Sequence, residues 1–318
     1  MTESTPMAEN QPPQSIPDQA ATLRKIVGLK KEERNTPLPL GDKMRVICVT
    51  SGKGGVGKTN IVVNLCLALT QLNKRVFLLD ADMGLANVDV MLGISPKYTL
   101  EHLMKGQKTI QEIVLENSGF RLLPASSGIT ELAEMTHDQQ MFLFQQLSNL
   151  DDDIDYLFID TGAGISTNVL RFNASANEVI IVATPEPTSM TDAYALMKLL
   201  VIKYHLRGFY LVANMVADEK EGMEVYKRLN SVCLHFLNVR LGYLGYVPQD
   251  GALRKAVRLQ VPLLKSFPDS LAAKSLKKLA LQLEATPDGP FGIPSLTDPP
   301  PVSPQTGFWD RLLHWKKV

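Results

Sequence analysis

From Met44 onward, short runs of β-branched and other apolar residues alternate with longer segments whose apolar positions recur every three or four residues. The short runs predict buried strands, and the longer segments predict amphipathic helices. The strands are expected at residues 45–50, 75–80, 120–124, 156–160, 178–183, 209–214 and 241–247. Helices are expected between them, among others at residues 60–72, 138–147, 189–204, 219–236 and 270–283.

This alternation is typical of βαβ units, in which each helix crosses over the sheet to the next parallel strand. The expected fold class is therefore α/β, with a single mainly parallel sheet of about seven or eight strands covered by helices on both faces. At 318 residues the chain has room for one large domain of this kind, expected at residues 38–285, and for two tails.

The two ends of the chain differ from this pattern. Residues 1–17 are rich in Pro, Gln, Ser and Thr and predict no core of their own. Residues 18–28 read as a short helix that Asp18 can cap and Gly28 can end, so residues 1–37 are expected to be disordered apart from one partner-docking helix. Residues 286–306, dense in Pro and Gly, predict an extended linker before a C-terminal helix at residues 307–318.

Composition limits the classes of function. Lys plus Arg and Asp plus Glu both number 33, so no overall positive field draws the chain to nucleic acid. The three cysteines are scattered without metal-ligand spacing and are expected to be reduced core residues. No apolar stretch is long enough for a signal peptide or a bilayer span, so the protein is expected in the cytoplasm.

The strongest chemical signal is Gly52-Lys-Gly-Gly-Val-Gly-Lys-Thr59, between a predicted strand and a predicted helix. This is the phosphate-binding loop pattern, in which glycines let backbone N–H groups turn toward phosphate oxygens. In that pattern Lys58 reaches the β and γ phosphates and the Thr59 hydroxyl ligates Mg²⁺, so ATP and Mg²⁺ are the expected cofactors. The residues expected around the phosphates are Gly52, Lys53, Gly54, Gly55, Val56, Gly57, Lys58, Thr59 and Asn60.

Two more acidic segments follow predicted strands. They are Leu78-Leu-Asp-Ala-Asp82-Met-Gly-Leu-Ala-Asn87 and Phe158-Ile-Asp160-Thr-Gly-Ala-Gly164. Because open α/β sheets bind ligands at the carboxyl ends of their strands, both segments are expected at the same edge as the loop.

With its second lysine, Lys53, the loop resembles the deviant Walker A box of the MinD/ParA family of positioning ATPases, and the two acidic segments resemble that family's two switches. The resemblance implies that Lys53 crosses to the nucleotide of a second subunit, that Asp82 orients the attacking water and also helps to hold Mg²⁺, and that Asp160 holds Mg²⁺ through water. Lys53, Lys58 and Asp82 are thus the expected catalytic residues of a slow ATPase that dimerises on ATP. Asn214, Pro248 and Asp250 are implied at the adenine.

The N-terminal Asp18-Gln-Ala-x-x-Leu-Arg24 resembles a motif of the FlhG (FleN) group, MinD-like regulators of flagellar number and placement. In that group the motif activates FlhF, a GTPase related to those of the signal recognition particle, so Asp18, Gln19, Leu23 and Arg24 are the implied partner contacts. A flagellar transcription activator or flagellar switch protein is a further implied partner. The alternative is a cap helix that packs on its own domain.

At the C-terminus an apolar arc appears when residues are placed 100 degrees apart on a helix. It contains Phe308, Trp309, Leu312, Leu313 and Trp315. This pattern predicts a helix that lies on the inner face of the cell membrane, at the cell pole if the flagellar resemblance holds. A helix docked on its own domain is the alternative.

Two other functions compete. One is a ParA-like partitioning ATPase whose dimer binds DNA through basic residues, namely Arg254, Lys255, Arg258, Lys277 and Lys278. The other is an iron-sulfur carrier of the same superfamily, which the scattered cysteines disfavour.

Overall fold

Alternating apolar residues along each central strand place side chains on both faces of one sheet. The computed structural model describes residues 44–82, 87–123, 142–143, 145–147, 150, 154–286 and 308–313. In the first strand, β1, Val46 and Cys48 face one apolar core while Ile47 and Val49 face the other. Because every central strand is covered on both faces, the strands are apolar almost throughout.

The sheet has eight strands in the order β3-β4-β2-β5-β1-β6-β7-β8. All neighbouring strands are parallel except β3, which pairs antiparallel with β4. The strands are β1 (Arg45–Ser51), β2 (Val76–Ala81), β3 (Leu115–Asn117), β4 (Phe120–Leu123), β5 (Tyr156–Ala163), β6 (Glu178–Ala183), β7 (Phe209–Val216) and β8 (Gly242–Pro248).

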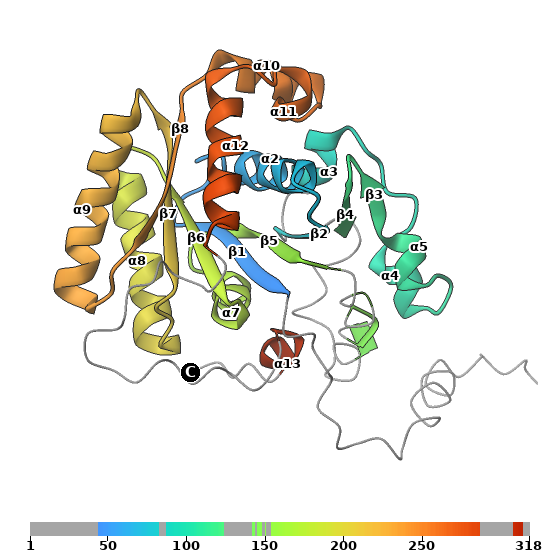
Figure 1. Cartoon of the computed structure of the whole chain (residues 1–318). Helices are drawn as coiled ribbons and strands as arrows, with labels where there is room; N and C mark the ends of the chain where they lie inside the picture. The colour runs from blue at the N-terminus through green and yellow to red at the C-terminus, as the bar shows by residue number, and fades with distance from the viewer. Residues whose placement is uncertain are drawn as a thin grey trace, which may run out of the picture. The chain divides into compact units, whose positions relative to one another are not determined.

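Helices cover both faces of this sheet (Figure 1). One face packs against α2 (Lys58–Gln71), α3 (Asn87–Leu92), α10 (Gly251–Leu259), α11 (Leu263–Ser266) and α12 (Leu271–Glu284). The other packs against α4 (Leu100–Met104), α5 (Ile110–Ile113), α7 (Thr167–Ser175), α8 (Pro187–Tyr204), α9 (Glu219–Leu237) and α13 (Phe308–Leu313). The expected α/β architecture is confirmed.

The seven predicted strands all exist, and their ends differ from the predictions by three residues at most. The sequence pattern did not predict β3, because three residues with one exposed position carry no clear periodicity. The sequence pattern also did not predict the short helices as individual elements. They are α3, α4, α5, α7, α10 and α11. Of the helix predicted at residues 138–147, only residues 142–143 and 145–147 are described, and they are helical.

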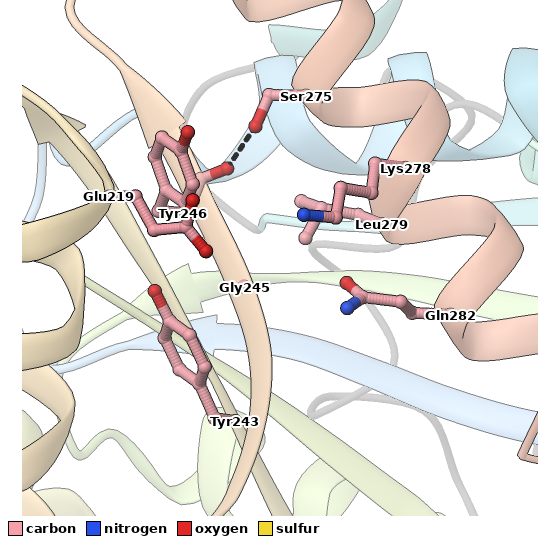
Figure 2. Close-up of a pocket in the computed structure, with 8 residues that line it drawn as sticks. All are labelled: Glu219, Tyr243, Gly245, Tyr246, Ser275, Lys278, Leu279 and Gln282. Atoms are coloured by element: carbon pink, nitrogen blue, oxygen red, sulfur yellow. Dashed lines mark hydrogen bonds between the residues drawn. The ribbon is translucent and has the colours of Figure 1, made fainter.

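Strand β8 forms one edge of the sheet, and side chains of α9 and α12 partly cover it. Gly245 has φ 137°, and a Cβ there would lie 2.5 Å from a leucine side chain of α12. The Ser275 hydroxyl of α12 donates to the carbonyl oxygen of Tyr246, which satisfies one backbone group of the edge. Figure 2 shows the shallow hollow over Gly245, between Tyr243 of the strand and Gln282 of α12.

The C-terminal helix α13 lies against α7. Phe308 and Leu312 are buried in the same core as α7 and α8. The Arg171 guanidinium donates to the carbonyl oxygen of Leu312 at 2.6 and 2.9 Å, and Arg311 Nε donates to the carbonyl oxygen of Ser175 at 2.9 Å. These bonds occupy carbonyl groups near the ends of both helices, which lack partners within a helix.

None of the helices in the described part of the chain has the length and apolar character needed to span a bilayer. The three cysteines are free thiols inside the core, as expected. The predicted docking helix at residues 18–28, the rest of residues 1–37 and residues 287–306 of the predicted linker lie outside the described residues.

Candidate functional site

The loop from Gly52 to Thr59 joins β1 to α2 at the carboxyl edge of the sheet. Gly55 and Gly57 have φ of 79° and 85°, a region that favours glycine. Apart from the neighbouring residues of the chain, no atom lies within 4 Å of where a Cβ would stand on Gly54 or Gly55, so this part of the loop borders open space. Helix α2 begins after Gly57 with no side-chain cap, so its first N–H groups are left for a ligand.

Lys58 is the first residue of α2, and its ammonium points to the end of β5. Its Nζ lies 3.0 Å from Asp160 Oδ1, and both side chains are buried. Complete burial raises the pKa of Asp160, although Lys58 and a hydrogen bond from the Thr59 hydroxyl act in the opposite direction. The second oxygen, Asp160 Oδ2, is buried without a hydrogen-bond partner among the described residues. An unsatisfied carboxylate oxygen beside Thr59 favours a bound cation or its water ligands.

A second carboxyl group, Asp80, stands directly beside Asp160. The two residues are register partners on β2 and β5, and Asp80 is fully buried. Burial, and then the charge of Asp160, raise the pKa of Asp80 to about 8. Its oxygens accept from the backbone N–H groups of Asp82 at 3.1 Å and Val88 at 3.3 Å. Asp80 therefore binds the start of α3 from a position next to Asp160. The sequence analysis missed this role.

Asp82 itself lies at the end of β2, half-buried, against the second acidic segment. A Cβ on Gly162 would lie 3.2 Å from Asp82 Oδ1, so the two acidic segments touch through a glycine. Residues 83–86, which follow Asp82, lie outside the described residues. Among the described residues, no three His, Cys, Asp or Glu side chains form a ready metal cluster.

Lys53, the second lysine of the loop, extends to α8. Its Nζ lies 2.8 Å from Glu186 Oε2 and 3.3 Å from Thr188 Oγ1, and 42% of its side chain is exposed. The loop is also packed on α8 at Gly52, where a Cβ would lie 2.1 Å from the backbone carbon of Asp192. Sequence reasoning missed Glu186 and Thr188, because they lie more than 130 residues from Lys53.

The residues predicted at the adenine take part in the scaffold around the loop. Asn214 Nδ2 donates to the carbonyl oxygen of Val56 at 2.7 Å. Pro248 ends β8 next to Val216 of β7. Asp250 accepts from backbone N–H groups at the starts of α10 and α12. Whether these three also contact the base stays a prediction.

Comparison with known proteins identifies the architecture of this site. A family model described as an AAA domain matches residues 44–205. The antiactivator FleN of Pseudomonas aeruginosa is 44% identical over 245 residues, which are 77% of this chain and 88% of FleN. The flagellum site-determining protein YlxH of Helicobacter pylori is 37% identical over 74% of this chain and 80% of YlxH. The chain belongs to the MinD/ParA family of P-loop ATPases.

Solved structures of MinD/ParA proteins share the fold. The cell division ATPase MinD of Pyrococcus furiosus matches with a TM-score of 0.60 and 26% identity, over 76% of this chain and 98% of that one. A chain of the MinC:MinD cell division protein complex of Aquifex aeolicus matches with a TM-score of 0.59 and 26% identity, over 76% of this chain and 96% of that one. Each alignment thus covers about three quarters of this chain and nearly the whole of the solved chain.

The donor set of this MinD/ParA site fits ATP and Mg²⁺. The open glycine loop and Lys58 would hold the phosphates, while Thr59 and the unpartnered oxygen of Asp160 would face Mg²⁺. When bound, Mg²⁺ would neutralise charge on the phosphates, which supply most of its ligands together with water.

The remaining predicted residues belong to the tails. Of the membrane set, the structure places the Phe308 and Leu312 side chains in the domain core. Trp315 and the side chains of Trp309 and Leu313 lie outside the described residues, as do Asp18, Gln19, Leu23 and Arg24. The membrane and partner roles of these residues stay predictions.

Proposed function

We propose that this protein is a Mg-ATP-dependent switch that alternates between a monomer and an ATP-bound dimer. The observation that carries the proposal is the arrangement of Lys58, Thr59 and Asp160 at the end of the sheet, beside the open glycine loop. These groups supply the positive charge, the hydroxyl and the carboxylate that a Mg-triphosphate requires. Hydrolysis would then remove the γ-phosphate that holds two subunits together.

Lys53 is the group proposed to act on the second subunit's nucleotide. In the described chain its ammonium pairs with Glu186, the residue just before α8 of the same subunit. The pair is largely exposed, so it is weak and can exchange for a phosphate contact at little cost. A lysine that enters the partner's site would stabilise charge on the transferred phosphoryl group, as an arginine finger does.

The C-terminal helix is proposed to bind the membrane in the ATP dimer. Phe308 and Leu312 lie in the domain core, so they must leave α7 before they can enter a lipid surface. Two tails on one dimer would bind far more tightly than one, because the second binds at a high effective concentration. Membrane residence would then follow the nucleotide.

The biological role proposed is control of the number and placement of flagella. It is supported by the similarity to the antiactivator FleN and to the flagellum site-determining YlxH. The N-terminal motif from Asp18 to Arg24 would stimulate an FlhF-type GTPase, and a flagellar transcription activator or switch protein would be a second partner. Location of the protein at the cell pole follows from this role and is part of the proposal.

The catalytic step is tested with Asp82→Ala. The variant should bind Mg-ATP like the parent, hydrolyse it at about one hundredth of the parent rate or below, and accumulate as a dimer, because the attacking water loses its orienting carboxylate while Lys58, Thr59 and Asp160 remain. Phosphate release and light scattering after gel filtration measure both effects. Lys58→Ala serves as the comparison, since it should lose nucleotide binding itself. A variant that hydrolyses ATP at the parent rate excludes the role of Asp82.

The partner step is tested with Gln19→Ala plus Leu23→Ala. GTP hydrolysis by a purified FlhF-type GTPase should no longer accelerate on adding this variant, while the variant's own ATPase stays at the parent level. Ser15→Ala, just outside the motif, is the matched control. Stimulation equal to that of the parent would exclude the activator role and leave the ATPase proposal standing.

A further inference from the structure

Helix α10 carries a basic and apolar surface that the nucleotide site does not use. Arg254 and Arg258, four residues apart, fall on one side of the helix and are exposed, and Val261, two residues after the helix ends, is exposed as well. The opposite side holds the buried Ala256, which belongs to the same apolar core as residues of α2 and α12. The outward side is thus a helix face that no described element covers.

Exposed apolar side chains interrupt the basic residues of this face. Val257, Leu259 and Val261 are 43%, 60% and 36% exposed. Val90 of α3 is 57% exposed, and its carbonyl oxygen accepts from Gln260 Nε2 at 3.0 Å, which joins the end of α10 to α3. We call the exposed side chains at positions 90, 254, 255, 257, 258, 259 and 261 the α3–α10 face.

The charge of this face is strongly one-sided. Residues 251–261 contain Arg254, Lys255 and Arg258 and no Asp or Glu. Within the described part of the chain, none of these three side chains makes an ion pair or a side-chain hydrogen bond. A protein of zero net charge therefore presents a local cluster of three cations that its own described domain does not neutralise.

We propose that the α3–α10 face is the docking site for an acidic amphipathic segment of a partner protein. Carboxylates of such a segment would pair with Arg254, Lys255 and Arg258, while its apolar residues would cover Val257, Leu259 and Val90. Mixed apolar and charged contacts of this kind are how amphipathic helices bind to a groove or face.

Other occupants match this face less well. A DNA backbone is matched by cations alone and gives no reason for four exposed apolar side chains between them. A second copy of the chain would bring two identical clusters of three cations together, which repel. A lipid surface would meet side chains such as Val257 and Val261 that are short, and α10 lacks the aromatic residues typical of interfacial helices.

The position of this face also allows it to respond to nucleotide, an extension that rests on the proposed function. Helix α3 begins five residues after Asp82, and its Val88 N–H binds Asp80 beside Asp160. Gln260 then connects α3 to α10. A shift of α3 when Mg-ATP binds would move Val90 relative to the basic residues and change the fit of the partner segment.

The test uses the full chain and a fluorescently labelled synthetic peptide, helical, with leucines along one side and glutamates on the others. Its binding is followed by fluorescence anisotropy in Mg-ADP and in a non-hydrolysable ATP analogue. We expect Arg254→Glu with Arg258→Glu, and separately Val257→Ser with Leu259→Ser, to weaken binding roughly tenfold or more. Lys220→Glu with Lys227→Glu on α9 changes charge equally and should have no effect.

Three results would overturn the docking site. In the first, the peptide fails to bind; in the second, a peptide with lysine in place of glutamate binds equally well; in the third, the variants of the α3–α10 face bind the peptide as the parent does. Tighter binding of a short random DNA duplex or of phosphatidylglycerol vesicles, lost in Arg254→Glu with Arg258→Glu, would assign the face to DNA or to membrane instead. Thermal unfolding of each variant confirms that it is folded.

Coupling to nucleotide is tested separately with Gln260→Asn, which keeps a residue suited to φ 54° but shortens the amide. The parent should bind the peptide with different affinity in the two nucleotides, and Gln260→Asn should reduce that difference to about twofold or less. Gln107→Asn, at an exposed position away from the nucleotide site and from the α3–α10 face, is the matched control. If ATP fails to produce a dimer, the proposed switch is wrong, yet peptide binding without nucleotide still decides whether the face exists.

Discussion

Individual residues in this protein are constrained mainly where backbones approach each other closely. Gly52 is packed on the backbone of α8, and Gly57 lies against Asn214, whose Nδ2 would be 2.5 Å from an added Cβ. Asn214 in turn holds the loop through Val56. The glycines of the loop are thus needed both for the ligand and for the contact of the loop with neighbouring elements.

Gly52→Ala should separate the loop from α8, because the new Cβ would lie 2.1 Å from Asp192 C and backbone atoms cannot move aside easily. We expect a loss of about 1–3 kcal/mol in the free energy of unfolding and weaker ATP binding. Urea denaturation and nucleotide titration measure the two effects. Gly251→Ala, with open space around the new Cβ, is the control and should leave ATP binding unchanged. Parent-like ATP affinity in Gly52→Ala would contradict this account.

At the scale of elements, one aspartate caps two helices. Asp250 Oδ1 accepts from Ala252 N–H at the start of α10 at 2.8 Å, and Oδ2 accepts from Ala272 N–H at the start of α12 at 3.0 Å. Burial acts to raise the pKa of Asp250, but these backbone hydrogen bonds outweigh it and the pKa is lowered. A lowered pKa means that folding favours the charged carboxylate.

Asp250→Ala should lower the free energy of unfolding by about 1–2 kcal/mol near neutral pH, since two helix starts lose their cap. The stabilisation from Asp250 is complete above the pKa of an unfolded aspartate, about 4, and is lost as the pH falls through the lower folded value. The difference between parent and variant should therefore shrink in acid. Urea denaturation across pH checks this, with the exposed Asp269→Ala as control. A difference independent of pH would refute the charge contribution.

At the scale of the molecule, α13 packs on one face of the sheet, and α2 lies on the other. Arg171 of α7 donates to a carbonyl oxygen of α13, and Arg311 of α13 donates to a carbonyl oxygen of α7. Phe308 and Leu312 of α13 are buried in the core that α7 also lines. The residues proposed for the membrane are in part residues that complete the domain. Membrane binding and domain packing therefore compete for the same side chains.

Arg171→Ala should release α13 and raise binding to anionic vesicles in Mg-ADP by about tenfold, because hydrogen bonds from a charged donor to Leu312 are lost. The chain has two tryptophans, Trp309 and Trp315, both in the tail, so intrinsic fluorescence reports on this segment alone. Arg207→Ala, which removes an exposed arginine bonded to the Asn238 carbonyl, is the control. Vesicle binding equal to that of the parent would show that the docking of α13 on its own domain does not limit membrane binding by the tail.

The local pattern by itself determined seven of the eight strands, the long helices α2, α8, α9 and α12, and the phosphate loop between β1 and α2. Periodicity and glycine spacing act within a few residues, so they can be read directly along the chain. Only the tertiary structure decided which side chains meet across the sheet. Asp80 lies beside Asp160 because β2 and β5 are neighbours in a register that the sequence does not state.

The same holds for Lys53 with Glu186, 133 residues apart, and for Arg171 with the carbonyl of Leu312, 141 residues apart. The amphipathic pattern of α13 fits a lipid surface and a protein core equally well, since both remove apolar side chains from water. Helix docking therefore depends on which apolar surface is within reach, and that is a property of the folded domain.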